Sequence, residues 1–162
     1  MATKLITENI WRDLTAAVKK SRTKSFVAVA YFAKGAANML PVKKGSILVV
    51  DASEKTVKCG LTKPAELINL YKKGVRIVSY ENLHAKLFIV NHALFIGSTN
   101  VSGNSSDRLK EVLLKSTDKK AIADAKFFIE SLCSVELGSE LLAKLDKMYR
   151  PPKMTGVKGK KS

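Results

Sequence analysis

Two kinds of hydrophobic pattern alternate through the first half of the chain. Residues 5–20 are predicted to form an amphipathic helix, because apolar residues recur there at helical spacing. These apolar residues are Ile10, Trp11, Leu14 and Val18. A second helix is predicted to begin near Pro64 and to end at Gly74, since proline is favoured in a first helical turn and glycine just past a last one. Residues 35–40 predict a shorter helix.

Uninterrupted apolar runs of strand length separate these helices. They cover residues 25–32, 46–50 and 75–79. A run without polar alternation is typical of a strand that is covered on both faces. Helices and buried strands that alternate in this way predict an α/β domain.

Strand-type segments lie closer together in the second half of the chain. Residues 84–90 and 93–96 predict two short strands joined as a hairpin at Asn91 and His92. A further strand is predicted over residues 109–114. This tighter spacing favours antiparallel pairing, so the sheet is expected to be mixed.

Two helices are predicted to complete the domain. Thr117 is expected to cap the first of them, which carries a stripe of apolar residues on one face. The stripe consists of Ile122, Ala125, Ile129 and Leu132. The last helix is predicted over residues 139–148. The whole pattern predicts an α/β sandwich with a mixed central sheet.

The charge of the chain is the first property that limits the range of possible functions. The chain has 29 Lys and Arg against 14 Asp and Glu, a net charge of +15 at pH 7. Residues 150–162 hold five of the basic residues, two prolines, two glycines and no acidic residue, which predicts a flexible basic tail or linker. The predicted folded domain, residues 1–149, keeps about +10. This excess favours a polyanionic partner, meaning nucleic acid or an anionic membrane surface.

The sequence also indicates the cellular compartment in which the protein is expected. No apolar run approaches the roughly 20 residues that cross a bilayer, so stable membrane association is not expected, and the first residues do not resemble a secretory segment. Cys59 and Cys133 form neither a CxxC motif nor a cluster with histidine. A disulfide scaffold and a structural zinc site are therefore not expected, and we expect a cytoplasmic protein with reduced thiols.

The most informative polar side chains lie between residues 83 and 111. His84 and Lys86 are separated by one residue, so on a strand both side chains point to the same face. The next predicted strand ends in Gly-Ser-Thr-Asn at residues 97–100. Glycine permits a close backbone approach, while serine and asparagine offer hydrogen bonds. If the two strands are neighbours, these groups converge on one end of the sheet.

Such a group of side chains suits phosphoryl transfer. Lys86 and Asn100 can hold the non-bridging oxygens of a phosphate. A histidine can attack phosphorus and form a covalent intermediate, which divides one difficult step into two. A carboxylate can orient that histidine through its other ring nitrogen, and Glu111 is a candidate for this role.

This stretch resembles the phospholipase D superfamily, whose signature is HxKxxxxD followed six residues later by GSxN. The residues at these spacings are His84, Lys86, Gly97, Ser98 and Asn100. In the single-motif nucleases of the superfamily a glutamate lies thirteen residues after the serine, which is the position of Glu111 here. One departure is that Asn91 stands where the signature has aspartate. In the family that aspartate looks mainly structural, so activity is expected to survive the change.

The resemblance implies both a fold and a mechanism. The fold would be a phospholipase D-like α/β/α sandwich with a mixed central sheet, and the reaction would need neither a metal nor another cofactor. The implied catalytic residues are His84, Lys86, Ser98, Asn100 and Glu111. The family uses two histidines, one as nucleophile and one as general acid, and His92 is wrongly placed for the second role. The resemblance therefore implies a homodimer that shares one site.

Among the possible functions, the sequence favours a DNA endonuclease. The basic charge points to nucleic acid, and the form of residues 97–102 is similar to nuclease domains of metal-independent restriction endonucleases, which favours DNA over RNA. Ser102, Asn104 and Arg108 follow the motif directly and are predicted to contact substrate, although a solvated connection explains them equally well. Two alternatives stay open, a phospholipase or phosphatidyltransferase acting on anionic lipid and a non-catalytic DNA-binding module.

Overall fold

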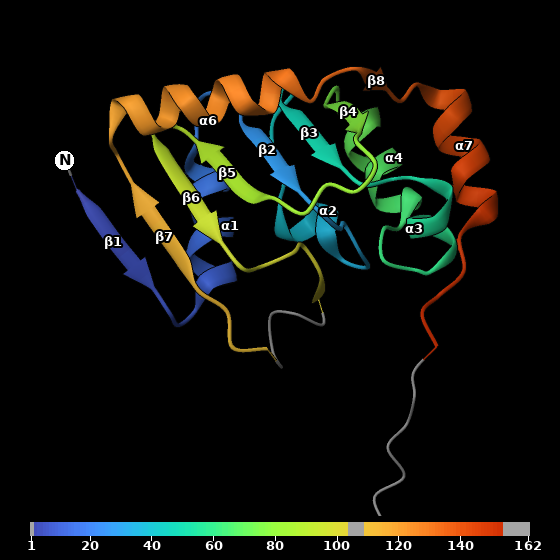
Figure 1. The fold of residues 1–162 in the computed structure, drawn as a ribbon, viewed down its shortest axis with the longest axis horizontal. Helices are drawn as coiled ribbons and strands as arrows, with labels where there is room; N and C mark the ends of the chain where they lie inside the picture. The colour runs from blue at the N-terminus through green and yellow to red at the C-terminus, as the bar shows by residue number, and fades with distance from the viewer. Residues whose placement is uncertain (1, 104–108, 154–162) are drawn as a thin grey trace, which may run out of the picture.

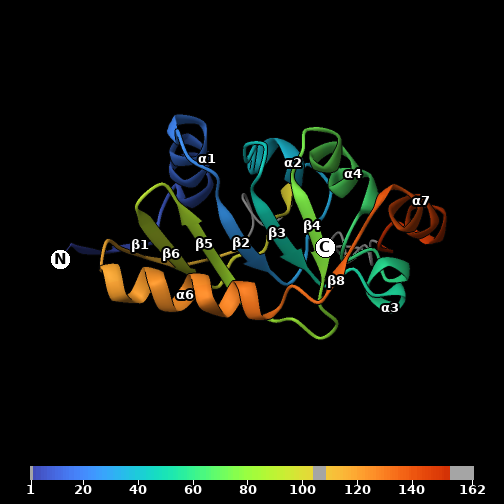
Figure 2. The same cartoon turned by 90° about the horizontal axis from the view of Figure 1, so that it is seen from above.

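The computed structural model describes residues 2–103 and 109–153, which form an eight-stranded mixed sheet with helices on both faces (Figures 1 and 2). In chain order its elements are β1 (Thr3–Ile6), α1 (Ile10–Lys20), β2 (Phe26–Val29), α2 (Ala36–Met39), β3 (Ile47–Val50), α3 (Glu54–Lys58), α4 (Pro64–Lys72), β4 (Arg76–Ser79), β5 (Lys86–Val90), β6 (Ala93–Gly97), β7 (Leu113–Ser116), α6 (Lys119–Ser131), β8 (Val135–Glu136) and α7 (Ser139–Met148). The predicted fold class is confirmed.

The strands follow the order β1-β7-β6-β5-β2-β3-β4-β8 across the sheet. Strand β3 runs parallel to both of its neighbours, whereas the other pairs are antiparallel. Parallel neighbours need a crossover connection, and α2 lies on the first crossover while α3 and α4 lie on the second. Strands β5 and β6 form the predicted hairpin.

Helices cover the two faces of the sheet unequally. Figure 2 shows α1, α2 and α4 on one face and α6 alone on the other. Successive residues of a strand point to opposite faces, so Val27 packs with the first group of helices while Ala28 packs with α6. Both residues are fully buried. Burial on both faces explains why the apolar run around β2 shows no polar alternation.

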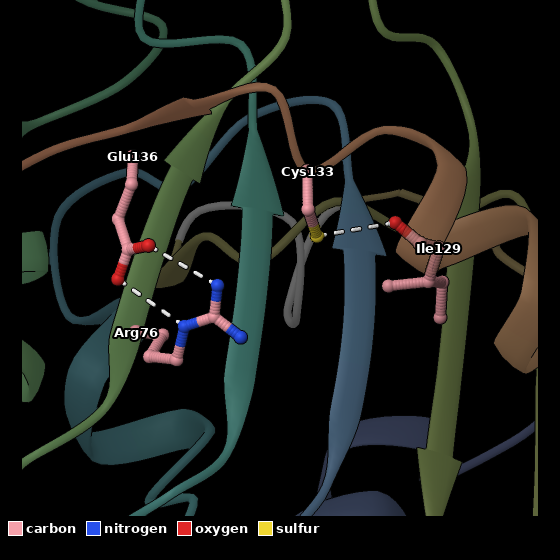
Figure 3. Close-up of polar contacts among 4 residues, drawn as sticks. All are labelled: Arg76, Ile129, Cys133 and Glu136. Atoms are coloured by element: carbon pink, nitrogen blue, oxygen red, sulfur yellow. Dashed lines mark hydrogen bonds and ion pairs between the residues drawn. The ribbon is translucent and has the colours of Figure 1, made fainter.

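An ion pair connects the short edge strand β8 to its neighbour β4. Arg76 Nε and Nη2 donate to the two carboxylate oxygens of Glu136 at 3.2 and 3.1 Å, and Cys133 Sγ donates to the carbonyl oxygen of Ile129 at 3.3 Å (Figure 3). The hydrogen bond from Arg76 lowers the pKa of Glu136. The pair therefore stabilises the fold above the ordinary carboxylate pKa and is lost as pH falls through the lowered value. Because both side chains are about half exposed, solvent screening limits it to about 0–1 kcal/mol.

The predicted first helix begins later than its pattern suggested. Helix α1 starts at Ile10, and the preceding segment forms β1, in which Leu5 and Ile6 pair with Leu114 and Leu113 of β7. The helical stripe of the sequence is confirmed, since all four of its apolar residues are buried. The partner strand lies more than 100 residues away along the chain, so no local pattern could identify β1.

Two boundaries in the second half also differ from prediction. Strand β7 begins at Leu113, because the chain before it forms an exposed connection at Leu109. Helix α6 is capped by Asp118, whose carboxylate accepts a hydrogen bond from the Ala121 amide at 2.7 Å, so Thr117 is not the cap. The short elements α3 and β8 were not predicted.

Candidate active site

The strand register places the predicted catalytic groups at one edge of the sheet. Strands β2 and β6 end at this edge, while β5 and β7 begin there. Lys86 pairs with Val29 at the end of β2, and Gly97 at the end of β6 pairs with Leu113 at the start of β7. In Figure 1 this is the lower edge of the sheet. The residues just outside these strand ends therefore gather in one region, the candidate active site, which is termed the catalytic edge.

His84 and Lys86 form the first pair of functional side chains. His84 is exposed and precedes β5, which begins at Lys86. The strand predicted over residues 84–90 therefore begins two residues later than expected, and His84 lies outside it. The Lys86 ammonium lies 3.4 Å from Nε2 of His84 and donates to the His84 carbonyl oxygen at 3.0 Å. Burial lowers the pKa of Lys86, and the negative charge of Glu111 opposes that shift. The lysine is thus a hydrogen-bond donor held beside the imidazole.

Ser98 and Glu111 form the second pair. The Ser98 hydroxyl donates a hydrogen bond to Glu111 Oε2. Ser98 Oγ also accepts from the Val112 amide at 3.0 Å, and the Ser98 amide donates to the Val112 carbonyl oxygen at 3.1 Å. The Glu111 charge acts on Lys86, so the two pairs belong to one electrostatic unit. Within the chain, the contact described for Glu111 is with Ser98 and not with the imidazole of His84.

Gly97 makes this second pair possible. A Cβ atom built on Gly97 would lie 1.9 Å from the carbonyl oxygen of Val112. Real carbon atoms do not approach an oxygen so closely, so only glycine lets β7 come this near the end of β6. The glycine of the motif is therefore explained by backbone packing.

Asn100 is held by the end of the β2 segment. Its Oδ1 accepts a hydrogen bond from the Tyr31 amide at 3.2 Å. This bond occupies the acceptor atom of the side chain, so Nδ2 is the donor that can reach an anion. Thr99 beside it is fully buried and accepts a hydrogen bond from the Trp11 indole at 3.0 Å. Trp11, predicted to be a core residue, therefore also fixes the Thr99 side chain within the motif.

Asn91 lies at the other end of β5. Asn91 lies five residues after Lys86 along extended strand, about 17 Å away at about 3.3 Å per residue. Its φ of 57° places it in the left-handed region, which asparagine tolerates better than most residues because its short side chain can bond locally. The departure from the motif therefore affects the hairpin turn and not the catalytic edge. His92 lies in the same turn and is exposed.

Two pockets flank the catalytic edge. One of about 280 Å³ is lined by His84, and another of about 300 Å³ is lined by Asn100 and Ser102. Tyr31 and Leu61 line both pockets. No sequence pattern singled out Tyr31, because it lies within an apolar run.

The predicted substrate contacts are only partly described. Ser102 is half-buried and lines the second pocket. Asn104 and Arg108 lie outside the described residues, so their predicted role stays a prediction. Within residues 2–103 and 109–153, no three His, Cys, Asp or Glu side chains gather as ligands of a metal ion. In the same ranges no helix is both long and apolar enough to span a bilayer.

No protein family model and no curated protein match the sequence, but solved structures do. NucT from Helicobacter pylori is 19% identical at a TM-score of 0.62, over 85% of this chain and 98% of NucT. Nuc from Salmonella typhimurium, a phospholipase D family member, is 14% identical at a TM-score of 0.64, over 84% of this chain and 96% of Nuc. Phosphatidylserine synthase from Haemophilus influenzae is 10% identical at a TM-score of 0.60, over 90% of this chain and 42% of the synthase. The chain therefore has the fold of the phospholipase D superfamily, whose sequence signature its motif resembles.

Proposed function

We propose that this protein is a metal-independent phosphodiesterase that cleaves DNA through a phosphohistidine. One observation carries the proposal. His84, Lys86, Ser98 and Glu111 meet at one edge of the sheet, in the fold of Nuc and NucT. In other proteins, a nucleophile beside a cation and a hydroxyl can attack a phosphate ester, because the neighbouring groups stabilise the charge that develops.

The first half of the reaction forms a bond between nitrogen and phosphorus. The lone pair of His84 Nε2 attacks the phosphorus atom, and the bond from phosphorus to the leaving oxygen breaks. A second imidazole, in its protonated form, gives its proton to that oxygen. Lys86 and Asn100 supply the donors that would hold the non-bridging oxygens, whose negative charge grows in the transition state. Ser98, whose hydroxyl proton goes to Glu111, holds that carboxylate in place.

The second half removes the phosphoryl group from the enzyme. The second imidazole, now neutral, accepts a proton from water. The resulting oxygen attacks phosphorus as the bond to His84 Nε2 breaks, which returns both imidazoles to their starting protonation states. The cycle therefore needs two histidines with opposite roles, whose titrations are coupled.

We infer that the second imidazole belongs to another copy of this chain. The sequence contains two histidines, and His92 lies about 17 Å from the catalytic edge, at the far end of β5. A two-fold axis beside the edge would bring two His84 rings to one phosphate.

An uncovered apolar row supports this dimer. Leu5, Leu114 and Ile96 are cross-strand neighbours on β1, β7 and β6, and they are 60%, 38% and 43% exposed. They lie on the face that α6 covers elsewhere, where Leu94 of the same strand is buried. Apolar side chains gathered in one exposed patch are typical of a protein interface. The row reaches the catalytic end of β6, so a second copy seated on it would lie beside the site.

The charge of the chain supports nucleic acid as the substrate. A net charge of +15 favours binding to a phosphate backbone, and such binding weakens as salt rises because condensed counterions are released. A phosphatidyl substrate uses the same phosphodiester chemistry and is the second candidate, since phosphatidylserine synthase has a similar fold.

An assay in EDTA separates the candidate functions. The protein is incubated with supercoiled plasmid and, separately, with phosphatidylcholine vesicles. We expect nicked plasmid in the presence of chelator and no released choline. Choline release without nicking would favour the lipid reaction, whereas retarded but uncut plasmid would favour a DNA-binding module.

Mixing active and inactive chains tests the shared site. The parent protein and a His84→Ala variant are unfolded, mixed in varied ratio at constant total concentration, and refolded together. If one site needs two His84 rings, activity follows the square of the parent fraction, so an equal mixture keeps about a quarter of full activity. Independent sites would instead give about half. A Lys119→Ala chain, altered at the exposed start of α6, provides the matched dilution control and should leave activity unchanged.

A further inference from the structure

A pocket beside the catalytic edge combines two aromatic side chains with the motif asparagine. Its volume is about 300 Å³, and its lining includes Tyr31, Tyr149, Asn100, Ser102 and Lys34. Ligand pockets commonly pair apolar or aromatic walls with a few polar groups that fix orientation. The volume is large enough for a planar aromatic ring.

Tyr31 is fixed at the boundary between this pocket and the pocket of His84. Its amide donates to Asn100 Oδ1 at 3.2 Å, and its carbonyl oxygen accepts from the Val101 amide at 3.3 Å. Tyr31 lines both pockets. A phosphate held between His84 and Asn100 would thus lie next to Tyr31, and the group attached to that phosphate would reach the Tyr149 pocket.

The opposite wall of the pocket comes from the end of the described chain. Pro151 and Pro152 line the pocket with Tyr149, and a Cβ atom on Gly60 would lie 2.6 Å from Pro152. Gly60 has a φ of +76°, a conformation that side chains rarely adopt. Glycine at this position thus allows the proline segment to lie against the domain. Lys63 lies over the Tyr149 ring, 5.9 Å from its centre.

We propose that the Tyr149 pocket binds the nucleobase next to the scissile phosphate, and that the protein consequently prefers single-stranded DNA. This inference rests on the proposed nuclease function. A base stacks on aromatic rings with little regard to sequence, and the backbone beside it carries the negative charge that Lys34 and Lys63 attract. In a duplex, the same base must first leave its stack and its pairing partner, which is costly.

The test is a binding measurement on protein that carries His84→Ala, so that cleavage does not interfere. Fluorescence anisotropy gives the Kd for a fluorescein-labelled single-stranded oligothymidylate, for an abasic strand of equal length, and for the corresponding duplex. Each is measured in the His84→Ala background with and without Tyr149→Ala. Tyr149→Phe keeps the ring, and Tyr71→Ala removes an exposed tyrosine from α4 as the matched control.

We expect Tyr149→Ala to weaken binding of the base-bearing single strand by roughly 5- to 150-fold. Binding of the abasic strand should change little, and Tyr149→Phe and Tyr71→Ala should match the background protein. Equal affinities for base-bearing and abasic strands, equal losses on both, or a preference for the duplex would overturn the proposal. Nicking by the parent protein is measured separately, so a failed pocket and a failed nuclease assignment give different results.

Tyr149 packs partly against the core, so Tyr149→Ala could disturb folding. Leu61→Ser alters the same pocket at a side chain that is 41% exposed, and thermal melting checks both variants. Leu61→Ser should also weaken binding of the base-bearing strand more than that of the abasic strand. If it affects both strands equally while melting as the parent does, the pocket does not hold a base.

Discussion

Replacing His84 with alanine is expected to reduce plasmid nicking by about 1000-fold or more. The change removes the nitrogen proposed to form the bond to phosphorus, and in a shared site it removes the general acid from the same pocket. Loss of a covalent nucleophile commonly has effects of this size. The measurement is the initial nicking rate in EDTA at saturating DNA, with thermal melting to confirm that the variant folds. His84 is exposed, so its truncation should leave the melting temperature unchanged.

Two substitutions at the far end of β5 are the matched controls. Asn91→Asp restores the signature residue and His92→Ala removes the other histidine, and both positions are exposed in the hairpin turn. Each variant should nick plasmid within about twofold of the parent rate, since neither residue lies near the catalytic edge. Residual nicking by His84→Ala close to the parent rate, or a comparable loss in His92→Ala, would contradict the assignment of the nucleophile.

The sequence predicted most of the elements that depend on local patterns. The hairpin of β5 and β6 could be predicted because Asn91 and His92 separate two apolar runs by a turn of suitable length. Helix α4 could be predicted from Pro64 at its start and Gly74 beyond its end, where φ is +88°. In each case neighbouring residues carry the physical cause.

Pairings between distant segments could not be predicted in the same way. Strand β1 exists because Leu5 lies opposite Leu114, and Leu5 alone fits the start of a helix equally well. The start of β7 is set by hydrogen bonds between Val112 and Ser98, which connect positions fourteen residues apart. Tertiary contacts override local propensity at such positions.

The candidate site likewise contains some residues that local sequence patterns predict and others that depend on contacts between distant segments. The spacing of His84, Lys86 and Ser98 suggested one group, and the strand register brings these residues to one edge. The role of Tyr31 depends on where the chain turns after β2 and on its hydrogen bond to Asn100. Nothing in an apolar run predicts that turn. The position of such a residue is known only once the segments that carry Tyr31 and Asn100 are placed side by side.

Replacing Gly97 with alanine is expected to destabilise the protein by about 3–5 kcal/mol and to abolish most of its activity. The new methyl group would overlap the Val112 carbonyl oxygen, so β7 must move away from the end of β6. Forced overpacking typically costs about 1–3 kcal/mol. Each of the two hydrogen bonds between Ser98 and Val112 contributes about 1 kcal/mol more. Urea unfolding measures the change in the free energy of unfolding.

Gly138→Ala supplies the control for this prediction. Gly138 has a φ of −87° and no atom within 4 Å of an added Cβ, so alanine should change the free energy of unfolding by less than about 1 kcal/mol. The two variants add the same methyl group, and only the one at Gly97 displaces Val112, which directly follows Glu111. If Gly97→Ala unfolds at the same urea concentration as Gly138→Ala and nicks plasmid normally, Ser98 and Glu111 do not need the close contact of β6 with β7. In that case the electrostatic unit that joins Glu111 to Lys86 is not required for cleavage.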